Sequence, residues 1–255
     1  WDLSDYYNPD PFAKDATYSN VGCFIPEVTF SPMEFGIPPN SLETITTQQL
    51  LCLLVAKEAF LDAGLGGPND KNPLREKTGV ILASTLGSTG FSLKSRTDIP
   101  VIAKILKNCG VPQNVIDEAT SRIEDNNVKW TENSFPGYLA NIASGRIANR
   151  FNLGGTNFVV DAACASSFSA VKMAIAELRS GDCDVVLTGG ANIDASALSY
   201  VSFSKTPALS PTGIARPFDE KSDGMIMGEG IGMVVLKRLA DANRDNDRIY
   251  AVIKD

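Results

Sequence analysis

The chain has 255 residues, of which 44% are hydrophobic and 21% are charged, so it can bury a large core and is not a disordered chain. Its formal net charge of −7, with no cluster of Lys and Arg residues, argues against a surface built to bind nucleic acid. The longest apolar run, residues 50–56, is far shorter than the roughly 20 residues that cross a bilayer, so no membrane span is expected.

The five cysteines lie far apart, form no C-x-x-C pair and are odd in number, and the chain has no histidine. They are Cys23, Cys52, Cys109, Cys164 and Cys183. This pattern predicts neither a disulfide framework nor a metal site, and it fits a reducing cytoplasm. The chain opens at Trp1 without a starting Met and ends at Asp255, directly after an apolar run typical of a strand. We therefore expect a fragment of a longer polypeptide.

The first part of the chain predicts an irregular segment, a helix and a strand. Residues 1–45 are rich in Pro, Asp and aromatic residues without a sustained period, which predicts an irregular N-terminal segment. A helix is predicted from Thr46, which forms a capping box with Gln49, to Gly64. The apolar run 78–84 is typical of a buried strand.

The middle of the chain predicts helices. Residues 91–130 alternate charged residues with Ile, Leu and Val at helical spacing, which predicts surface helices of a cap or insertion. Residues 139–151 predict a helix of small residues suited to close packing. Four short apolar runs further along predict strands: 157–162, 184–189, 231–236 and 248–253.

A helix is predicted between the first two of these strands, over residues 165–180, with Gly181 as its stop. Its apolar face is expected to consist of Phe168, Val171, Ile175 and Leu178. Strand, helix and strand at this spacing predict a right-handed βαβ unit, and hence an α/β sheet with helices on its faces.

A glycine-rich run, Gly228-Glu229-Gly230-Ile231-Gly232, resembles part of a dinucleotide-binding motif. A predicted strand follows this run, so no helix N-terminus is available to hold a pyrophosphate. We therefore interpret the run as a hairpin.

Cys164 is the candidate nucleophile because it stands between the predicted strand 157–162 and the predicted helix 165–180. The N–H groups of a first helical turn have no intrahelical partner, and the positive end of the helix dipole stabilises a thiolate. The N–H of Cys164 itself can also stabilise the oxyanion that forms when a thiol attacks a thioester. The alternative is that Cys164 is a buried small hydrophobe, as most free cysteines are. The other four cysteines are expected to be structural.

The residues around Cys164 resemble a known motif. The segment Asp161-Ala162-Ala163-Cys164-Ala165-Ser166-Ser167 resembles the nucleophile motif of β-ketoacyl synthases. Further motifs of that family follow in the same order and spacing: Phe35-Gly36-Ile37, Gln48-Gln49, Asp62-Ala63-Gly64-Leu65, Phe203 with Ala208-Leu209-Ser210, Pro217-Phe218-Asp219, Asp223-Gly224, Gly228-Glu229-Gly230 and Val235-Leu236-Lys237-Arg238-Leu239. Within the family, the chain is most similar to ketosynthase domains of polyunsaturated fatty acid synthases and related iterative polyketide synthases. One departure is that Leu50 stands where the family has an Arg.

The resemblance implies a thiolase-like α/β fold, in which two similar halves form α-β-α-β-α layers and the protein is normally a homodimer. Residues 1–255 would then be the N-terminal portion of a β-ketoacyl synthase, truncated at both ends. In this family two histidines and a lysine from the later half complete the site, together with a second oxyanion N–H from a glycine-rich loop. That C-terminal half is expected to be absent here, so the chain alone is expected to be inactive.

The resemblance also implies an activity, a decarboxylative Claisen condensation. Cys164 would accept an acyl group from the phosphopantetheine arm of an acyl carrier protein and pass it to a malonyl thioester. Phe203, Asn141 and Ile142 would line the acyl tunnel, although packing is an equal alternative for each. No metal or bound cofactor is implied.

Three alternatives stay open. A non-catalytic ketosynthase-like scaffold, or chain-length partner subunit, usually lacks the cysteine. A cysteine hydrolase would need a histidine base. A third alternative is a condensing enzyme that uses coenzyme A thioesters directly. The sequence does not distinguish it well from an enzyme that uses a carrier protein.

Overall fold

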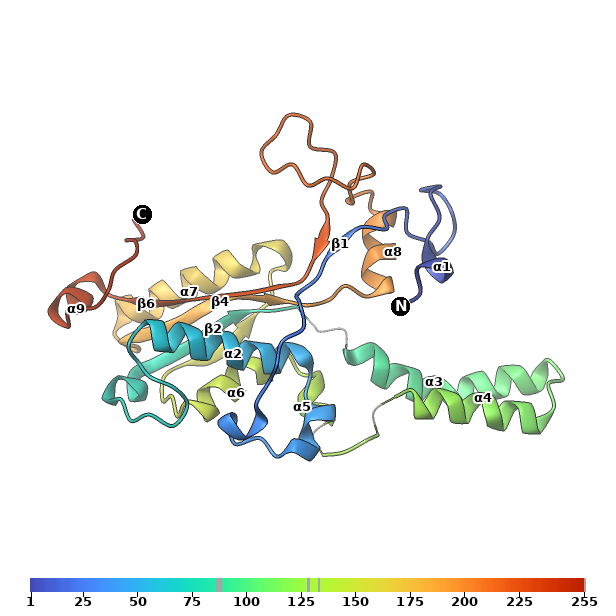
Figure 1. Cartoon of the computed structure of the whole chain (residues 1–255), viewed down its shortest axis with the longest axis horizontal. Coiled ribbons are helices and arrows are strands. Elements are labelled where there is room, and N and C mark those ends of the chain that lie inside the picture. Colours follow the sequence, from blue (N-terminus) through green and yellow to red (C-terminus); the bar gives the residue numbers. More distant parts are fainter. Residues whose placement is uncertain (86–88, 128, 133, 255) are drawn as a thin grey trace. The chain divides into compact units, whose positions relative to one another are not determined.

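The computed structural model describes residues 1–85, 89–127, 129–132 and 134–254. The chain divides into two compact units. Unit 1 consists of Trp1–Thr29 and Asn192–Ile231, and unit 2 consists of Phe30–Ala191 and Gly232–Asp255. Figure 1 labels their elements along the chain. Within the described residues, no helix combines the length and the apolar character that a membrane span requires.

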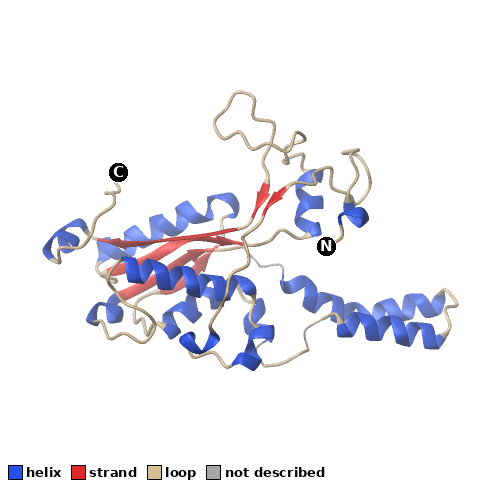
Figure 2. Cartoon of the chain, in the orientation of Figure 1, coloured by secondary structure: helices blue, strands red, loops and turns tan. Residues whose placement is uncertain are grey.

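A four-stranded sheet forms the centre of unit 2, with its strands in the order β3-β2-β4-β6 (Figure 2). The strands are β2 (Thr78–Ala83), β3 (Asn157–Val160), β4 (Val185–Asn192) and β6 (Gly230–Lys237). β2 runs parallel to both of its neighbours, and all of its residues are buried. A strand buried on both faces is typical of a parallel sheet covered by helices. The α/β class and four of the predicted strands are thus confirmed.

Helix α7 (Ser166–Ser180) connects β3 to β4, as the predicted strand–helix–strand unit requires. Both strands are parallel to β2, which lies between them, so the connection crosses over one strand. The helix ends at Gly181, whose φ of 83° lies in the left-handed region that glycine adopts without strain. The predicted helix 165–180 and its stop are confirmed.

The predicted apolar face of α7 is wrong in part. The residues that pack on the sheet are mostly small: Ala170, Ala174 and Leu178. Phe168 is instead 80% exposed, and Val171 and Ile175 are only half-buried. Small side chains let a helix lie close to a sheet. The bulky side chains of Phe168, Val171 and Ile175 are therefore not on the face that packs on the sheet. Helical periodicity alone ranks the bulky residues as the core face, which is why the prediction failed.

The opposite face of the sheet is covered by α6 (Ile142–Arg150), and α2 (Thr47–Asp62) packs on α6 (Figure 1). The rings of Phe60 and Phe151 lie 5.0 Å apart in this layer, and both side chains are buried. The predicted helix 139–151 is therefore present, but it begins three residues later than expected.

Thr46 caps α2 as predicted, because its Oγ1 accepts a hydrogen bond from the N–H of Gln49. The side chain of Gln49 turns to α6 instead of completing the predicted capping box. Its Oε1 accepts a hydrogen bond of 3.1 Å from Arg146 Nε, and its Nε2 donates to the carbonyl of Pro136. Gln49 therefore joins two helices, a tertiary role that local sequence rules do not predict.

The predicted surface helices within 91–130 are α3 (Thr89–Asn108) and α4 (Gln113–Asp125), which pack on each other. Residue 128 of that range lies outside the described part of the chain. Shorter helices of unit 2 are α5 (Ser134–Tyr138), α9 (Leu239–Arg244) and the 3₁₀ turns Pro32–Phe35, Pro39–Thr44 and Pro73–Lys77.

Unit 1 contains short elements, as the irregular composition of 1–45 predicts for its N-terminal part. They are α1 (Leu3–Tyr6), β1 (Gly22–Cys23), α8 (Ala197–Lys205) and β5 (Met227–Gly228). β1 and β5 pair in parallel. The core of unit 1 is a cluster of Tyr200, Leu209 and Met227, against which Phe203 packs.

Two predictions near the C-terminus are wrong. The run 228–232 is not a hairpin, because β5 pairs with β1 while β6 pairs with β4, and the chain passes from one sheet to the other. The predicted strand 248–253 pairs with no strand within the described residues. An extended run becomes a strand only where a neighbour satisfies its N–H and C=O groups, and local pattern cannot show that neighbour.

Candidate active site

Cys164 lies at the junction between a strand and a helix, as predicted. β3 ends at Val160, a 3₁₀ turn formed by Ala163–Ala165 contains Cys164, and α7 begins at Ser166. The side chain of Cys164 is exposed. A thiol in this position has the free N–H groups of a helix start beside it and can be reached by a substrate.

The turn that carries Cys164 is strained. Ala163, the preceding residue, has a φ of +50°, a conformation that costs a residue with a Cβ about 1–2 kcal/mol. Asp161 Oδ1 accepts a hydrogen bond of 3.0 Å from the N–H of Ala163. Ser166 Oγ accepts a hydrogen bond of 2.7 Å from the N–H of Ala162 and donates one of 2.6 Å to the carbonyl of Ala163. Side chains on both sides of Cys164 therefore hold the turn.

Sequence patterns alone do not assign Asp161 or Ser166 to this role. A signal is nevertheless present, because Asp and Ser side chains commonly bond to backbone groups two to four residues away and stabilise turns. The positive φ of Ala163, between them, has no counterpart in the sequence pattern.

Other polar residues lie at the same edge of the sheet. Ser84 follows β2, and its N–H donates to the carbonyl of Val160 at the end of β3. Gln48 of α2 donates from Nε2 to Ser84 Oγ at 2.6 Å. The carboxyl ends of parallel strands are where α/β proteins bind their ligands, so this edge is the place expected for a site.

The residues predicted to line an acyl tunnel lie in or next to two helices, α6 and α8. Asn141 is exposed at the start of α6, and Ile142 is half-buried next to it, on the helix that covers the opposite face of the sheet from α7. Phe203 belongs to unit 1, where its ring packs against the core. The packing alternative is thus observed for Phe203, and a role of these three residues in binding stays a prediction.

The other cysteines fall into two classes. Cys52 and Cys183 are buried, and burial raises the pKa of Cys52 to about 12 and also raises the pKa of Cys183. Cys23 and Cys109 are exposed, like Cys164. All five cysteines are free. At neutral pH, therefore, only the three exposed thiols are accessible to a reagent.

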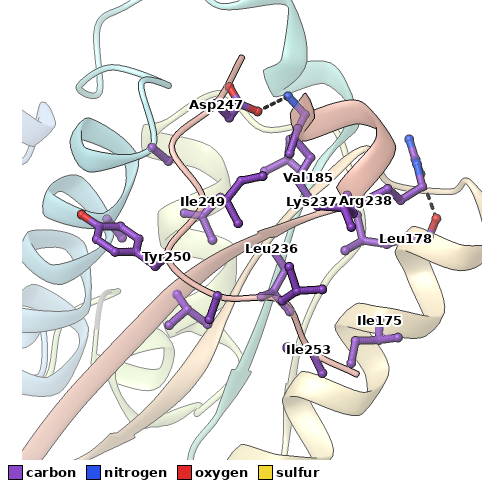
Figure 3. Close-up of a pocket in the computed structure, with 18 of the residues that line it drawn as sticks. Ile175, Leu178, Val185, Leu236, Lys237, Arg238, Asp247, Ile249, Tyr250 and Ile253 are labelled. Atoms are coloured by element: carbon purple, nitrogen blue, oxygen red, sulfur yellow. Dashed lines mark hydrogen bonds and ion pairs between the residues drawn. The ribbon is translucent and has the colours of Figure 1, made fainter. Parts of the chain in front are cut away.

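An apolar groove of about 1530 Å³ lies between α7 and β6, the edge strand of the sheet (Figure 3). Its walls are the bulky side chains of α7, the strand β6, the residues that follow α9, and the end of α2 with parts of the loop after it. Ile175 and Leu236 line it, together with Ile249 and Ile253 of the unpaired C-terminal segment (Figure 3). At its rim, Lys237 Nζ bonds to Asp247 Oδ2 at 2.6 Å. The groove begins at Phe168, one helical turn beyond Cys164, which is not part of its lining.

No group of three or more Cys, Asp or Glu side chains in the described residues is arranged to hold a metal ion.

Comparison with known proteins identifies the family. A family model described as "Beta-ketoacyl synthase, N-terminal domain" matches residues 1–242. A polyunsaturated fatty acid synthase subunit of Thraustochytrium sp. is 42% identical over 254 residues, which are 99% of this chain and 9% of that protein. The chain therefore spans about a tenth of the length of this relative.

Two solved structures show the same fold. The "PfaC Keto synthase-Chain length factor" structure has a TM-score of 0.82 and 28% identity, over 98% of this chain and 26% of that chain. The oxazolomycin ketosynthase domain OzmH KS7 of Streptomyces albus has a TM-score of 0.73 and 26% identity, over 97% of this chain and 38% of that chain. These likenesses confirm the thiolase-like α/β fold. The chain belongs to the β-ketoacyl synthase family.

Proposed function

We propose that this chain is the nucleophile-bearing part of a ketosynthase, in which Cys164 carries the growing acyl chain. The observation that carries the proposal is the exposed thiol of Cys164 at the start of α7, in a turn held by side chains on both sides. The 42% identity to a polyunsaturated fatty acid synthase supports fatty acid synthesis as the setting.

The proposed reaction has two steps. The thiolate of Cys164 attacks the carbonyl carbon of an acyl thioester, the new C–S bond forms, the old C–S bond breaks, and the carrier leaves as its thiolate. A malonyl thioester then loses CO₂, and its enolate carbon attacks the acyl-cysteine and releases the Cys164 thiolate. Dividing the reaction at a covalent intermediate replaces one difficult step by two easier ones. In both steps the N–H of Cys164 donates to the carbonyl oxygen as it becomes negative.

The partners follow from the same proposal. The acyl and malonyl groups arrive on the phosphopantetheine of an acyl carrier protein, and the complete enzyme is a cytoplasmic homodimer. Five free cysteines fit that reducing compartment. A chain-length partner is the second candidate, since one structural neighbour includes a chain length factor. The presence of Cys164 in an exposed position favours the condensing role.

The chain supplies only part of the site. It has no histidine, so the imidazoles that such a reaction uses must come from elsewhere in the synthase. The apolar groove along α7 is exposed, and exposed apolar surfaces of this kind are normally covered by another element or partner. We infer that the C-terminal half of the ketosynthase covers this groove and completes the site.

The isolated 255-residue chain is accordingly expected to make no 3-ketoacyl product from acyl and malonyl thioesters. The product is measured by mass spectrometry, with the complete ketosynthase as the positive control. Turnover by the isolated chain would contradict the inference that groups outside it are needed.

Iodoacetamide at neutral pH tests the nucleophile assignment. Cys164 is expected to react about tenfold faster than Cys23 and Cys109, which are also exposed but do not lie at the start of a long helix. Peptide mass spectrometry gives the rate at each cysteine. Cys52 and Cys183 serve as internal controls for folding, because they stay unmodified while the core is intact. Equal rates at the three exposed cysteines would defeat the assignment.

A further inference from the structure

The hydroxyl of Ser166 bonds to the turn around Cys164 at two points. It accepts from the N–H of Ala162 at 2.7 Å and donates to the carbonyl of Ala163 at 2.6 Å. Cys164 lies between these two residues and Ser166 in the sequence, so the link closes a small loop around it. A hydroxyl has one proton to donate, and here that proton is used within the loop.

The hydrogen bonds made by Ser166 are better sheltered from water than the one made by Asp161. Ser166 is 6% exposed, whereas Asp161 is exposed and its bond to the N–H of Ala163 competes with water. Hydrogen bonds sheltered from water lose more when one partner is removed, because the remaining donor and acceptor stay unsatisfied.

The link opposes a specific strain. Ala163 has a φ of +50°, and an alanine that is free to relax returns to negative φ. Rotation about that bond would change the direction in which the next residue, Cys164, leaves the turn. The two bonds of Ser166 are made to the carbonyl of Ala163 itself and to the N–H of the residue before it, on the two sides of the strained dihedral angle.

The helix start is also seated closely on the sheet. A Cβ added to Gly190 of β4 would lie 3.4 Å from the Cβ of Ser167 and 3.7 Å from that of Ala83. The first turn of α7 is therefore held by its packing on the sheet. The 3₁₀ turn before it, which contains Cys164, is held by the bonds of Ser166.

We propose that Ser166 is a positioning residue for Cys164: its doubly bonded hydroxyl keeps Ala163 in its left-handed conformation and so holds the thiol at the helix start. This inference rests on the proposed function, in which Cys164 is the nucleophile. Ser166 does not touch substrate and acts through the backbone on either side of the thiol.

Replacing Ser166 with alanine removes both bonds and leaves the helix sequence otherwise intact. Cys164 in Ser166→Ala is expected to react with iodoacetamide about tenfold more slowly than in the wild-type chain, the effect of losing one to two sheltered hydrogen bonds. Ser166→Thr keeps the hydroxyl and should restore the rate to within about threefold. Rates measured from about pH 6 to about pH 10, on either side of the ordinary cysteine pKa, separate a change in the ionisation of the thiol from a change in its accessibility.

Ser180→Ala is the matched control. Ser180 Oγ lies at the other end of α7, within hydrogen-bonding distance of the carbonyl of Glu177, at 3.0 Å, and of Asp182 Oδ2, at 2.6 Å. Its loss should leave the rate at Cys164 unchanged. Cys23 reports on general changes in reactivity, and the buried Cys52 reports on unfolding.

The outcomes separate the two proposals. Selective labelling of Cys164 in the wild-type chain with an unchanged rate in Ser166→Ala would overturn the role of Ser166 alone. A wild-type chain in which Cys164 is no faster than Cys23 would overturn the nucleophile assignment itself. If Ser166→Ala exposes Cys52, its labelling is repeated at a lower temperature at which Cys52 stays protected. A wild-type rate at Cys164 in that variant would also overturn the role of Ser166.

Discussion

Cys164→Ala should abolish acyl loading of the complete ketosynthase and lower its condensation rate by about 10³-fold or more. The methyl group of alanine cannot form the thioester, so the two-step route is lost. The fold should be little changed, because Cys164 is exposed and fills no core position. Acyl loading is followed with a radiolabelled acyl thioester, and condensation by the yield of 3-ketoacyl product.

Cys23→Ala and Cys109→Ala are the controls for this prediction. Both residues are exposed cysteines away from the start of α7, so their replacement should leave loading and condensation within about twofold of wild type. If Cys164→Ala still accepts the acyl group and either control variant does not, the nucleophile is a residue other than Cys164.

Gly189→Ala should destabilise the chain by more than about 3 kcal/mol, because β4 and β6 approach too closely there for a side chain. Gly189 has a φ of +154°, which L-residues rarely adopt. An added methyl group would clash with the carbonyl oxygen of Gly232 and lie 2.8 Å from Met233 Cα. Backbone atoms of a central sheet cannot move aside cheaply. Urea unfolding measured by circular dichroism gives the change in the free energy of unfolding.

Gly232→Ala and Gly181→Ala separate the causes of this effect. A Cβ at Gly232, on the other side of the same contact, would meet nothing within 4 Å, so this variant should change stability by less than about 1 kcal/mol. Gly181 has a φ of 83° but open space around it, so its variant should show the cost of strain alone, about 1 kcal/mol. A Gly189→Ala chain as stable as Gly232→Ala would show that the close approach of β4 and β6 is not required.

The strands and helices of unit 2 could largely be predicted because their signals are local. The run 78–84 is mostly apolar, and its residues 78–83 form a fully buried strand. Gly181 ends α7 where the sequence places its stop. The position of Cys164 followed from the same signals, since a strand and a helix on either side fix a junction between them.

Features that depend on distant partners could not be predicted. The face of α7 that packs on the sheet depends on how closely the helix approaches the sheet. The small Ala170 and Ala174 therefore lie on this face, and the bulky Phe168 does not. The run 248–253 has the composition of a strand but lacks a neighbouring strand within the described residues. The hydrogen bonds made by Ser166 depend on the positive φ of Ala163, which no sequence pattern predicts.

Mapping the acyl group after the complete ketosynthase has been incubated with an acyl thioester, without malonyl donor, tests the central claim most directly. The enzyme is digested, and the peptides are analysed by mass spectrometry under conditions that preserve thioesters. We predict that the mass of the acyl group is found on the peptide that contains Cys164, and that hydroxylamine removes it. An acyl group found on the peptide of Cys23 or Cys109, or no covalent adduct at all, would contradict the account.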